Sequence, residues 1–198
     1  FRFAKDSHKL VISDNKASHH DMPGQSSLIY DEVSGGGREE SRISGWIKTQ
    51  ELGPGKCSMQ DYNFENPKTN LLSSQEILPA ATVGKVTHKL KVGGNDKFEI
   101  FDYPGSYENK GQGKDVAKHA MELMEMSQFV ILGESNIYYL TSGYKFALTK
   151  HPNAEGSYIL TSVTHSASEG GFHSGSDVGN NHYANSFRSI PFSLLFRP

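Results

Sequence analysis

The chain has 198 residues, which is enough for one or two domains. Its 20 Lys and Arg residues against 22 Asp and Glu residues give a formal charge of −2, which offers no overall positive field to nucleic acid or an anionic membrane. No stretch reaches the roughly 18 apolar residues of a membrane-spanning helix, so we expect neither a nucleic-acid partner nor a membrane-spanning segment.

The 20 glycines, 11 phenylalanines and 9 tyrosines favour a chain rich in strands and loops. The single cysteine, Cys57, excludes an internal disulfide and is expected to be a small, half-buried strand residue. The chain begins at Phe1 as if within a strand and ends at Pro198 as if within a linker. We therefore expect a fragment of a larger protein.

The first forty residues predict a hairpin followed by loops. Residues 1–3 and 8–12 are its expected arms, and residues 15–27 form a polar loop that contains His19 and His20. Adjacent histidines point apart on a strand and no third ligand follows at helical spacing, so we expect no metal there. The glycine-rich run 34–40 lacks the Lys-Ser/Thr ending of a phosphate-binding loop and is expected to be a flexible loop.

Two further hairpins are predicted in the middle of the chain. Residues 41–52 and 56–64 are expected to pair around the turn at 53–55, with Trp46 as a core anchor. Residues 83–92 and 97–103 are expected to pair around the turn at 93–96. Phe98, Ile100 and either Phe101 or Tyr103 would then be buried anchors.

One helix is predicted, over residues 114–127. Its apolar residues recur at spacings of three and four, which gives one stripe to pack against a sheet. The stripe consists of Val116, Ala117, Ala120, Leu123 and Met124. The Gly-x-Gly pair at 111 and 113 lacks a third glycine and a preceding βαβ context, so we do not expect a nucleotide site.

The last third of the chain predicts the back half of an antiparallel barrel. Runs of β-branched and aromatic residues at 130–132, 144–148 and 158–165 are separated by turn residues, and residues 183–190 are a further strand. On the third run, alternation places Ile159, Thr161, Val163 and His165 on one face. The polar stretch 166–181 between the last two strands is a long loop.

No arrangement of catalytic residues stands out. Ser135 follows Gly133 but lacks the closing glycine of a nucleophile elbow, and Glu99 and Asp102 face opposite sides of a predicted strand. The sequence therefore predicts a protein that is not an enzyme, without catalytic residues, cofactor or metal. Two alternatives stay open: a metal-dependent hydrolase that uses a histidine cluster, and a cell-surface glycan-binding β-module that uses tyrosines between 166 and 183. The histidines of the first alternative are His165, His173 and His182.

Several short motifs occur in a characteristic order along nearly the whole chain. They are HKLVISD at 8–14, DYNFENP at 61–67, EIFDYPGSY at 99–107, GES at 133–135, GYKFALTKHP at 143–152, YILTSVTH at 158–165, YANSFRSIP at 183–191 and FRP at 196–198. In this order they resemble the VgrG spike proteins of type VI secretion and the related phage late control protein D group, the baseplate hubs of contractile tails.

The resemblance implies a structural hub. Proteins of this kind are trimers whose two related barrels per subunit form a ring that mates with the hexameric tube protein Hcp. It also implies baseplate, effector and PAAR tip partners, assembly in the bacterial cytoplasm, and later injection into target cells or the extracellular space.

The expected fold is mainly β, a β-rich α+β chain. It has an antiparallel barrel of the tail-tube type, one packed helix and connecting hairpins. Residues 1–82 would be connecting hairpins and part of the hub barrel. Residues 83–198 would be the second barrel, with the first barrel and the needle absent.

Overall fold

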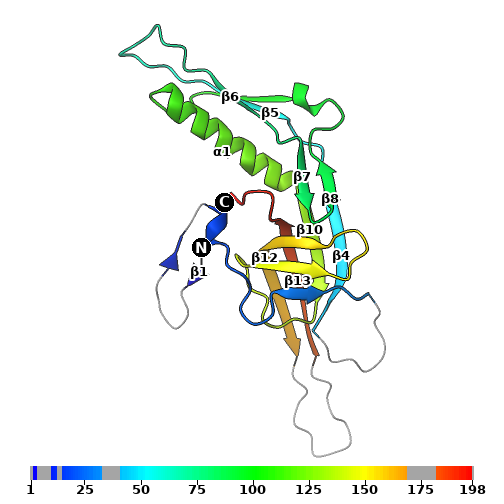
Figure 1. The fold of residues 1–198 in the computed structure, drawn as a ribbon. Coiled ribbons are helices and arrows are strands. Elements are labelled where there is room, and N and C mark those ends of the chain that lie inside the picture. Colours follow the sequence, from blue (N-terminus) through cyan, green and yellow to red (C-terminus); the bar gives the residue numbers. More distant parts are fainter. Residues whose placement is uncertain (1, 4–9, 13–14, 33–40, 169–181, 198) are drawn as a thin grey trace, which may run out of the picture.

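The computed structural model describes residues 2–3, 10–12, 15–32, 41–168 and 182–197 (Figure 1). This part is mostly strands with one α-helix, and its main sheet curls into a half-barrel, so the expected fold class is confirmed. No helix in the described ranges is long and apolar enough to cross a membrane. The expected division near residue 82 falls inside a strand, β7 (Ala80–Val83), and stays a prediction.

In the described residues the main sheet has six strands, and the last of these in sequence lies in its interior. Its order is β3 (Ser27–Ile29), β11 (Lys145–Thr149), β12 (Gly156–Ser168), β13 (His182–Pro191), β10 (Phe129–Ser135) and β4 (Ile43–Gln50). All neighbours are antiparallel except β3 and β11. Beyond β3, a single bridge from Tyr30 to Ile43 links the two outer strands, and the Asp31 amide donates to the Ile43 carbonyl at 3.0 Å.

Aromatic rings fill the inside of the curled sheet. Phe146 and Tyr158 are each 1 % exposed and stack with ring centroids 5.8 Å apart. Trp46 meets Tyr158 edge-on at 4.8 Å and also contacts Phe146 and Phe187. The prediction that Trp46 anchors the core is confirmed.

The predicted strands of the last third are confirmed, with one change in detail. Residues 145–149 and 156–168 form a hairpin, and residues 129–135 and 182–191 are strands of the same sheet. The register shifts between Leu160 and Ser162, and Tyr158, Ile159 and Leu160 are all buried. The predicted alternation of faces along residues 158–165 is therefore wrong, because a bulge resets it.

A smaller module extends beyond one end of the half-barrel (Figure 1). It contains a three-stranded sheet in the order β6 (Ser73–Glu76), β5 (Lys56–Met59) and β9 (Glu99–Asp102), and the helix α1 (Lys110–Gln128) packs on β5 and β6. A hairpin of β7 and β8 (Val86–Lys89) lies between this sheet and the half-barrel. At the N-terminus, β1 (Arg2–Phe3) and β2 (Leu10–Val11) pair antiparallel as predicted.

The two hairpins predicted in the middle of the chain are wrong. β4 pairs with β10, whereas β5 pairs with β6 and, in parallel, with β9. The buried side chain of Asn95 explains the geometry: its amide donates to the carbonyls of Gly53 and Leu90, and its oxygen accepts from the Val92 amide. Asn95 thus ties the two expected turns, 53–55 and 93–96, to each other. The strands on either side of these turns pair with partners other than those expected.

The β7–β8 hairpin occupies the region where one continuous strand, 83–92, was expected. Gly84 forms its turn with φ of 54°, and a Cβ at that position would lie 2.1 Å from the Glu155 carbonyl oxygen. Only glycine fits such a turn. β6 was missed altogether, because its sequence Ser-Ser-Gln-Glu carries no apolar alternation.

Helix α1 begins four residues before its predicted start. Asn109 caps it, since its Oδ1 accepts the Gln112 amide at 3.0 Å. Its fully buried stripe overlaps the predicted one only at Ala117, and Leu123 is 43 % exposed. The buried residues of the helix are Gly113, Ala117, Met121, Glu125 and Gln128.

Polar groups join the C-terminal residues to α1 and to Lys16 near the N-terminus. Arg197 donates from Nε and Nη2 to Glu122 Oε2, each at 2.7 Å, and Lys16 Nζ donates to the Ser193 carbonyl. One turn along the helix, Glu125 is 4 % exposed and accepts the Leu78 amide at 2.6 Å. Burial raises the pKa of Glu125 to about 7, and the nearby Glu122 adds to the increase.

Candidate assembly surface

The motifs at 61–67 and 99–107 fold against each other at the end of the three-stranded sheet. Asp61 accepts the Tyr62 amide through Oδ1 at 2.7 Å and the Tyr107 amide through Oδ2 at 3.2 Å. The Tyr62 amide is the main cause of a lowered pKa of the Asp61 carboxyl. Asn63 accepts the amides of Glu65 and Asn66 and donates to the Glu108 carbonyl. These polar residues fix two loops to each other.

Tyr107 is the buried centre of this arrangement. Its hydroxyl lies 2.7 Å from the carbonyl oxygens of both Met59 and Leu71, which share its single proton. A Cβ at Gly105 would lie 2.3 Å from the Tyr107 ring, and one at Gly113 would lie 2.5 Å from it. Gly105 and Gly113 therefore make room for the ring, which gives Gly113, the second glycine of the Gly-x-Gly pair before the predicted helix, a packing role.

We expect Tyr107→Phe to lower the free energy of unfolding by about 1–3 kcal/mol, because two largely buried carbonyls lose their donor while the ring keeps its packing. Urea denaturation of wild type and variant measures the loss. The matched control is Tyr138→Phe, since Tyr138 is 73 % exposed. Equal stability of Tyr107→Phe and wild type would show that the shared hydrogen bond contributes nothing.

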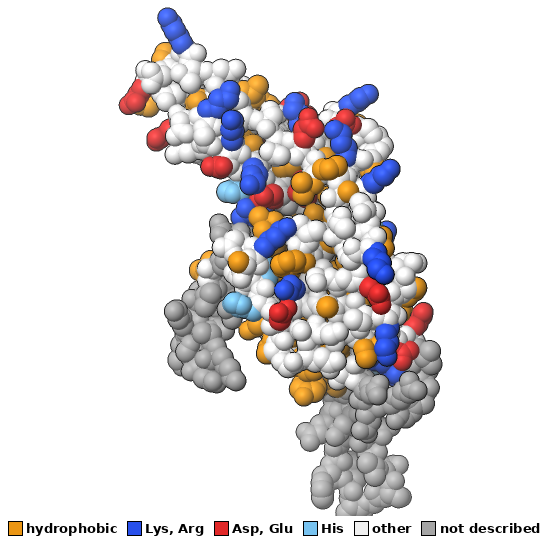
Figure 2. Space-filling view, in the orientation of Figure 1, with side chains coloured by type: hydrophobic (Ala, Val, Ile, Leu, Met, Phe, Trp, Pro, Cys, Tyr) orange, Lys and Arg blue, Asp and Glu red, His pale blue; other side chains and the backbone are white. Residues whose placement is uncertain are grey.

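The supported loops and β9 present aromatic side chains to solvent. Phe98, Phe101 and Tyr103 are 53 %, 56 % and 59 % exposed, and Tyr62 and Phe64 are 60 % and 81 % exposed. We call these five residues the aromatic edge. The prediction that Phe98, Phe101 or Tyr103 anchors the core is wrong, and Ile100 is also 39 % exposed. Figure 2 shows hydrophobic side chains at the surface of this module, among charged ones.

Two acids lie beside the aromatic edge. All four residues of β9 are exposed, and Glu99 and Asp102 bound its two apolar residues. The Ser58 hydroxyl lowers the pKa of the Glu99 carboxyl, and so does Lys56, which forms an ion pair with Glu99 at 3.0 Å. Cys57 lies beneath this surface at 0 % exposure, more buried than expected, and burial raises the pKa of its thiol. A buried, protonated thiol is not a nucleophile.

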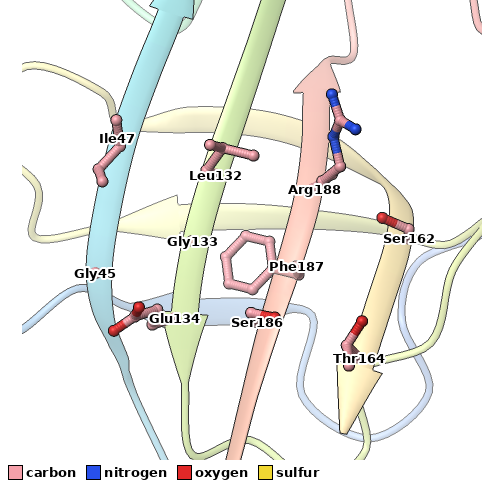
Figure 3. Close-up of a pocket in the computed structure, with 10 residues that line it drawn as sticks. All are labelled: Gly45, Ile47, Leu132, Gly133, Glu134, Ser162, Thr164, Ser186, Phe187 and Arg188. Atoms are coloured by element: carbon pink, nitrogen blue, oxygen red, sulfur yellow. The ribbon is translucent and has the colours of Figure 1, made fainter.

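A second open feature is a shallow pocket of about 450 Å³ on the outer face of the half-barrel (Figure 3). Ile47 and Leu132 are paired neighbours there, and they are 64 % and 40 % exposed. The Phe187 ring lies over the backbone of Gly133 on the neighbouring strand, where a Cβ at Gly133 would lie 2.2 Å from the Phe187 Cζ. Charged residues flank the apolar pair: Glu134 on β10 and Arg188 on β13.

The histidines of the hydrolase alternative are not brought together in the described part. His165 pairs with Asn185 and His182 with Ser168, three residues further along β12, so the two rings belong to opposite faces of the sheet. His173 lies outside the described residues. Within the described ranges, no group of three or more His, Cys, Asp or Glu residues is placed to hold a metal ion. The hydrolase and glycan-binding alternatives stay predictions, since residues 169–181 are not described.

Ser135 takes part in a buried polar network that the sequence did not predict. Its hydroxyl donates to Asn185 Oδ1 at 2.8 Å, and the Asn185 amide donates to the Ile137 carbonyl at 2.8 Å and to the Tyr183 hydroxyl at 3.0 Å. Tyr183 in turn contacts His165 Nδ1. Ser135 and His165 are not in contact in this chain of hydrogen bonds, and the network fixes the ends of β10 and β13.

The family model of the phage tail baseplate hub matches residues 1–171. The chain belongs to this family. Its relatives are spike proteins: this hub chain is 24 % identical over 200 residues to the type VI secretion system spike protein VgrG1c of Pseudomonas aeruginosa, and 22 % identical to VgrG1a of the same species. Both alignments cover all of the hub chain but only 26 % and 29 % of the relatives. The actin cross-linking toxin VgrG1 of Vibrio cholerae is 23 % identical over 193 residues, which are 96 % of the hub chain and 16 % of the toxin.

Two solved structures share the fold of the hub chain. A 43 kDa tail protein of prophage MuSo2 from Shewanella oneidensis superposes with a TM-score of 0.55 at 6 % identity, over 90 % of the hub chain and 46 % of the tail protein. A tail protein from Neisseria meningitidis gives 0.53 at 8 % identity, over 85 % and 44 %. The resemblance to VgrG and phage hub proteins seen in the motifs is thereby confirmed.

Proposed function

We propose that the hub chain works by assembly: as part of a homotrimer, it seats the hexameric tube of a type VI secretion or phage-tail-like injection machine. Baseplate, effector and PAAR tip proteins would be its further partners. It would assemble in the bacterial cytoplasm and leave with the spike. The hub family and the VgrG relatives support this class of function.

The observation that carries the proposal is the aromatic edge. Its side chains are held outward by loops whose polar groups are hydrogen-bonded, while the half-barrel has its own packed core. Apolar side chains gathered at a rigid surface are typical of protein interfaces, where Tyr and Phe are enriched. A permanent interface of this kind buries on the order of 2,000 Å² or more in total.

We also propose that the hub chain has no catalytic role. The Ser135 network and the separation of His165 from His182 support this, because neither arrangement joins a nucleophile to a base or gathers metal ligands. Stoichiometric zinc in the purified protein, lost in His165→Ala, would overturn this part of the proposal.

In the full-length protein, we expect light scattering to give the mass of a trimer and the tube protein to bind it. The double variant Phe98→Ser/Phe101→Ser should shift the protein toward monomer, because it removes apolar area from the aromatic edge. Tyr138→Ser is the control, since Tyr138 is 73 % exposed on the half-barrel and lies outside the aromatic edge. A wild-type protein that is monomeric at all concentrations and does not bind the tube protein would contradict the proposal.

A further inference from the structure

Strand β9 has a free side in the described part of the chain, where it pairs only with β5. The Phe98 carbonyl accepts the Lys56 amide and the Asp102 carbonyl accepts the Gln60 amide, so these residues direct their backbone groups toward β5. Backbone direction alternates along a strand. Glu99 and Phe101 therefore direct their N–H and C=O groups to the free side.

The free side is protected only by the short length of β9 and by the two acids at its ends. β9 pairs with β5 without a bulge, and its four residues contain neither Pro nor Lys. Such an edge is a template for another strand, and Ile100 and Phe101 add apolar side chains to it. An added strand would also cover part of the aromatic edge.

A second β9 does not fit this side in a trimer. Antiparallel pairing of two β9 strands is a two-fold contact, which closes a dimer, and parallel pairing in register would set each acid opposite itself. Like charges in directly opposed positions destabilise a sheet. A strand that offers a basic residue opposite an acid of β9, together with apolar neighbours, is the better occupant.

Strand β4 has this composition and a free side of its own. Between the Tyr30 bridge at Ile43 and the end of the strand, β4 pairs only with β10 among the described residues. Its exposed residues include Ile47, at 64 %, and Lys48. The Glu51 amide donates to the Gln128 carbonyl on the β10 side, so alternation directs the backbone groups of Trp46 and Lys48 to the free side.

We propose that β9 of one copy of this chain pairs antiparallel with β4 of a second copy, with Glu99 opposite Lys48 and Phe101 opposite Trp46. In this register all four residues offer backbone groups that face the new partner, as a hydrogen-bonded antiparallel pair requires. Ile100 then lies opposite Ile47, Phe98 opposite Thr49, and Asp102 opposite Gly45. The pairing rests on the proposed function, since it is a contact between copies of the hub.

The contact joins two different surfaces, so it is head-to-tail. Contacts of this type close into rings when the rotation between subunits permits, and a trimer is such a ring. The rows of side chains on the two faces of the paired strands would then continue from one subunit into the next. β4 would then no longer be a free edge of the half-barrel.

Cysteine cross-linking in the full-length protein tests the register. Opposed residues of a non-hydrogen-bonded antiparallel pair have Cα atoms about 4.5 Å apart, within the range of a disulfide. The double variant Ile47→Cys/Ile100→Cys should form disulfide-linked oligomers under mild oxidation, and either single variant should not. Cys57, the one cysteine of these 198 residues, is 0 % exposed and does not compete, and any cysteines outside them are first replaced by serine. The control is Ile47→Cys/Tyr138→Cys, which places the second cysteine at a more exposed position outside β9 and should give no cross-link.

A charge exchange gives a second readout. Lys48→Glu should cause loss of the cross-link in the Ile47→Cys/Ile100→Cys background, and adding Glu99→Lys should restore it. If the wild type is a trimer and the Ile47→Cys/Ile100→Cys trimer gives no cross-link, the pairing is overturned and the proposed function stands. A protein that forms no oligomer would instead overturn the proposed function.

Discussion

Replacing Phe146 with alanine should lower the free energy of unfolding by about 3–5 kcal/mol, the usual cost of removing a buried aromatic side chain. Phe146 is 1 % exposed, and its ring centroid lies 5.8 Å from that of Tyr158, 6.1 Å from that of Phe187 and 6.4 Å from that of Trp46. These rings come from four strands of one sheet. They cannot move independently to fill the cavity that Phe146 leaves, so the cavity remains. Urea denaturation of wild type and variant measures the effect.

The matched control uses the same substitution on the surface. Phe64 is 81 % exposed in the aromatic edge, and Phe64→Ala should change the stability of the single chain by less than about 0.5 kcal/mol. If Phe146→Ala and Phe64→Ala have equal effects, the aromatic cluster inside the curled sheet is not the core. The same pair also separates folding from assembly, because only the Phe64 side chain belongs to the proposed interface.

Replacing Glu125 with glutamine should stabilise the protein by about 3 kcal/mol at pH 8 and leave it nearly unchanged at about pH 4. The folded-state pKa of Glu125 is raised from 4.5 to about 7, chiefly by burial. The folded protein therefore holds this proton more tightly than the unfolded chain does. The wild type loses stability as the pH rises from about 4.5 to 7, at about 1.4 kcal/mol per pH unit. Glutamine is never charged and keeps an oxygen to accept the Leu78 amide.

Urea midpoints at several pH values test this expectation. The wild-type and Glu125→Gln curves should coincide near about pH 4, diverge between about pH 4.5 and 7, and stay apart above about pH 7. Asp115→Asn is the control on the same helix, because Asp115 is exposed and the variant should retain the wild-type pH dependence. Parallel wild-type and Glu125→Gln curves across the whole range would show that the carboxyl of Glu125 is not the source of the dependence.

The sequence predicted the strands of the half-barrel because their apolar residues alternate locally. Residues 145–149 and 156–160 combine β-branched and aromatic side chains with a turn between them, so both the strands and their pairing could be read. The pairing of β4 with β10 could not be, since about 80 residues separate the partners and no local pattern encodes a distant register. β6 was beyond prediction for a different reason: its four residues are polar and it is held by its neighbours.

The candidate site illustrates the same limit. Phe98 and Phe101 have the pattern of core residues, and only the structure shows that they face outward. An apolar strand on an edge and an apolar strand in a core have the same sequence when the edge is covered by another subunit. The motifs at 61–67 and 99–107 did signal the region, but their buried polar contacts, such as Tyr107 with Met59 and Leu71, depend on loops far apart in sequence.

The position of β13 has a consequence for synthesis of the protein. Among the described strands β13 is made last, yet it joins β12 on one side to β10 on the other. Until it emerges from the ribosome, β4 with β10 and β3 with β11 and β12 are two ribbons linked at the Tyr30–Ile43 bridge, with exposed inner faces. These apolar faces are open to association with other chains until β13 emerges, and completion of the sheet is a late, single event.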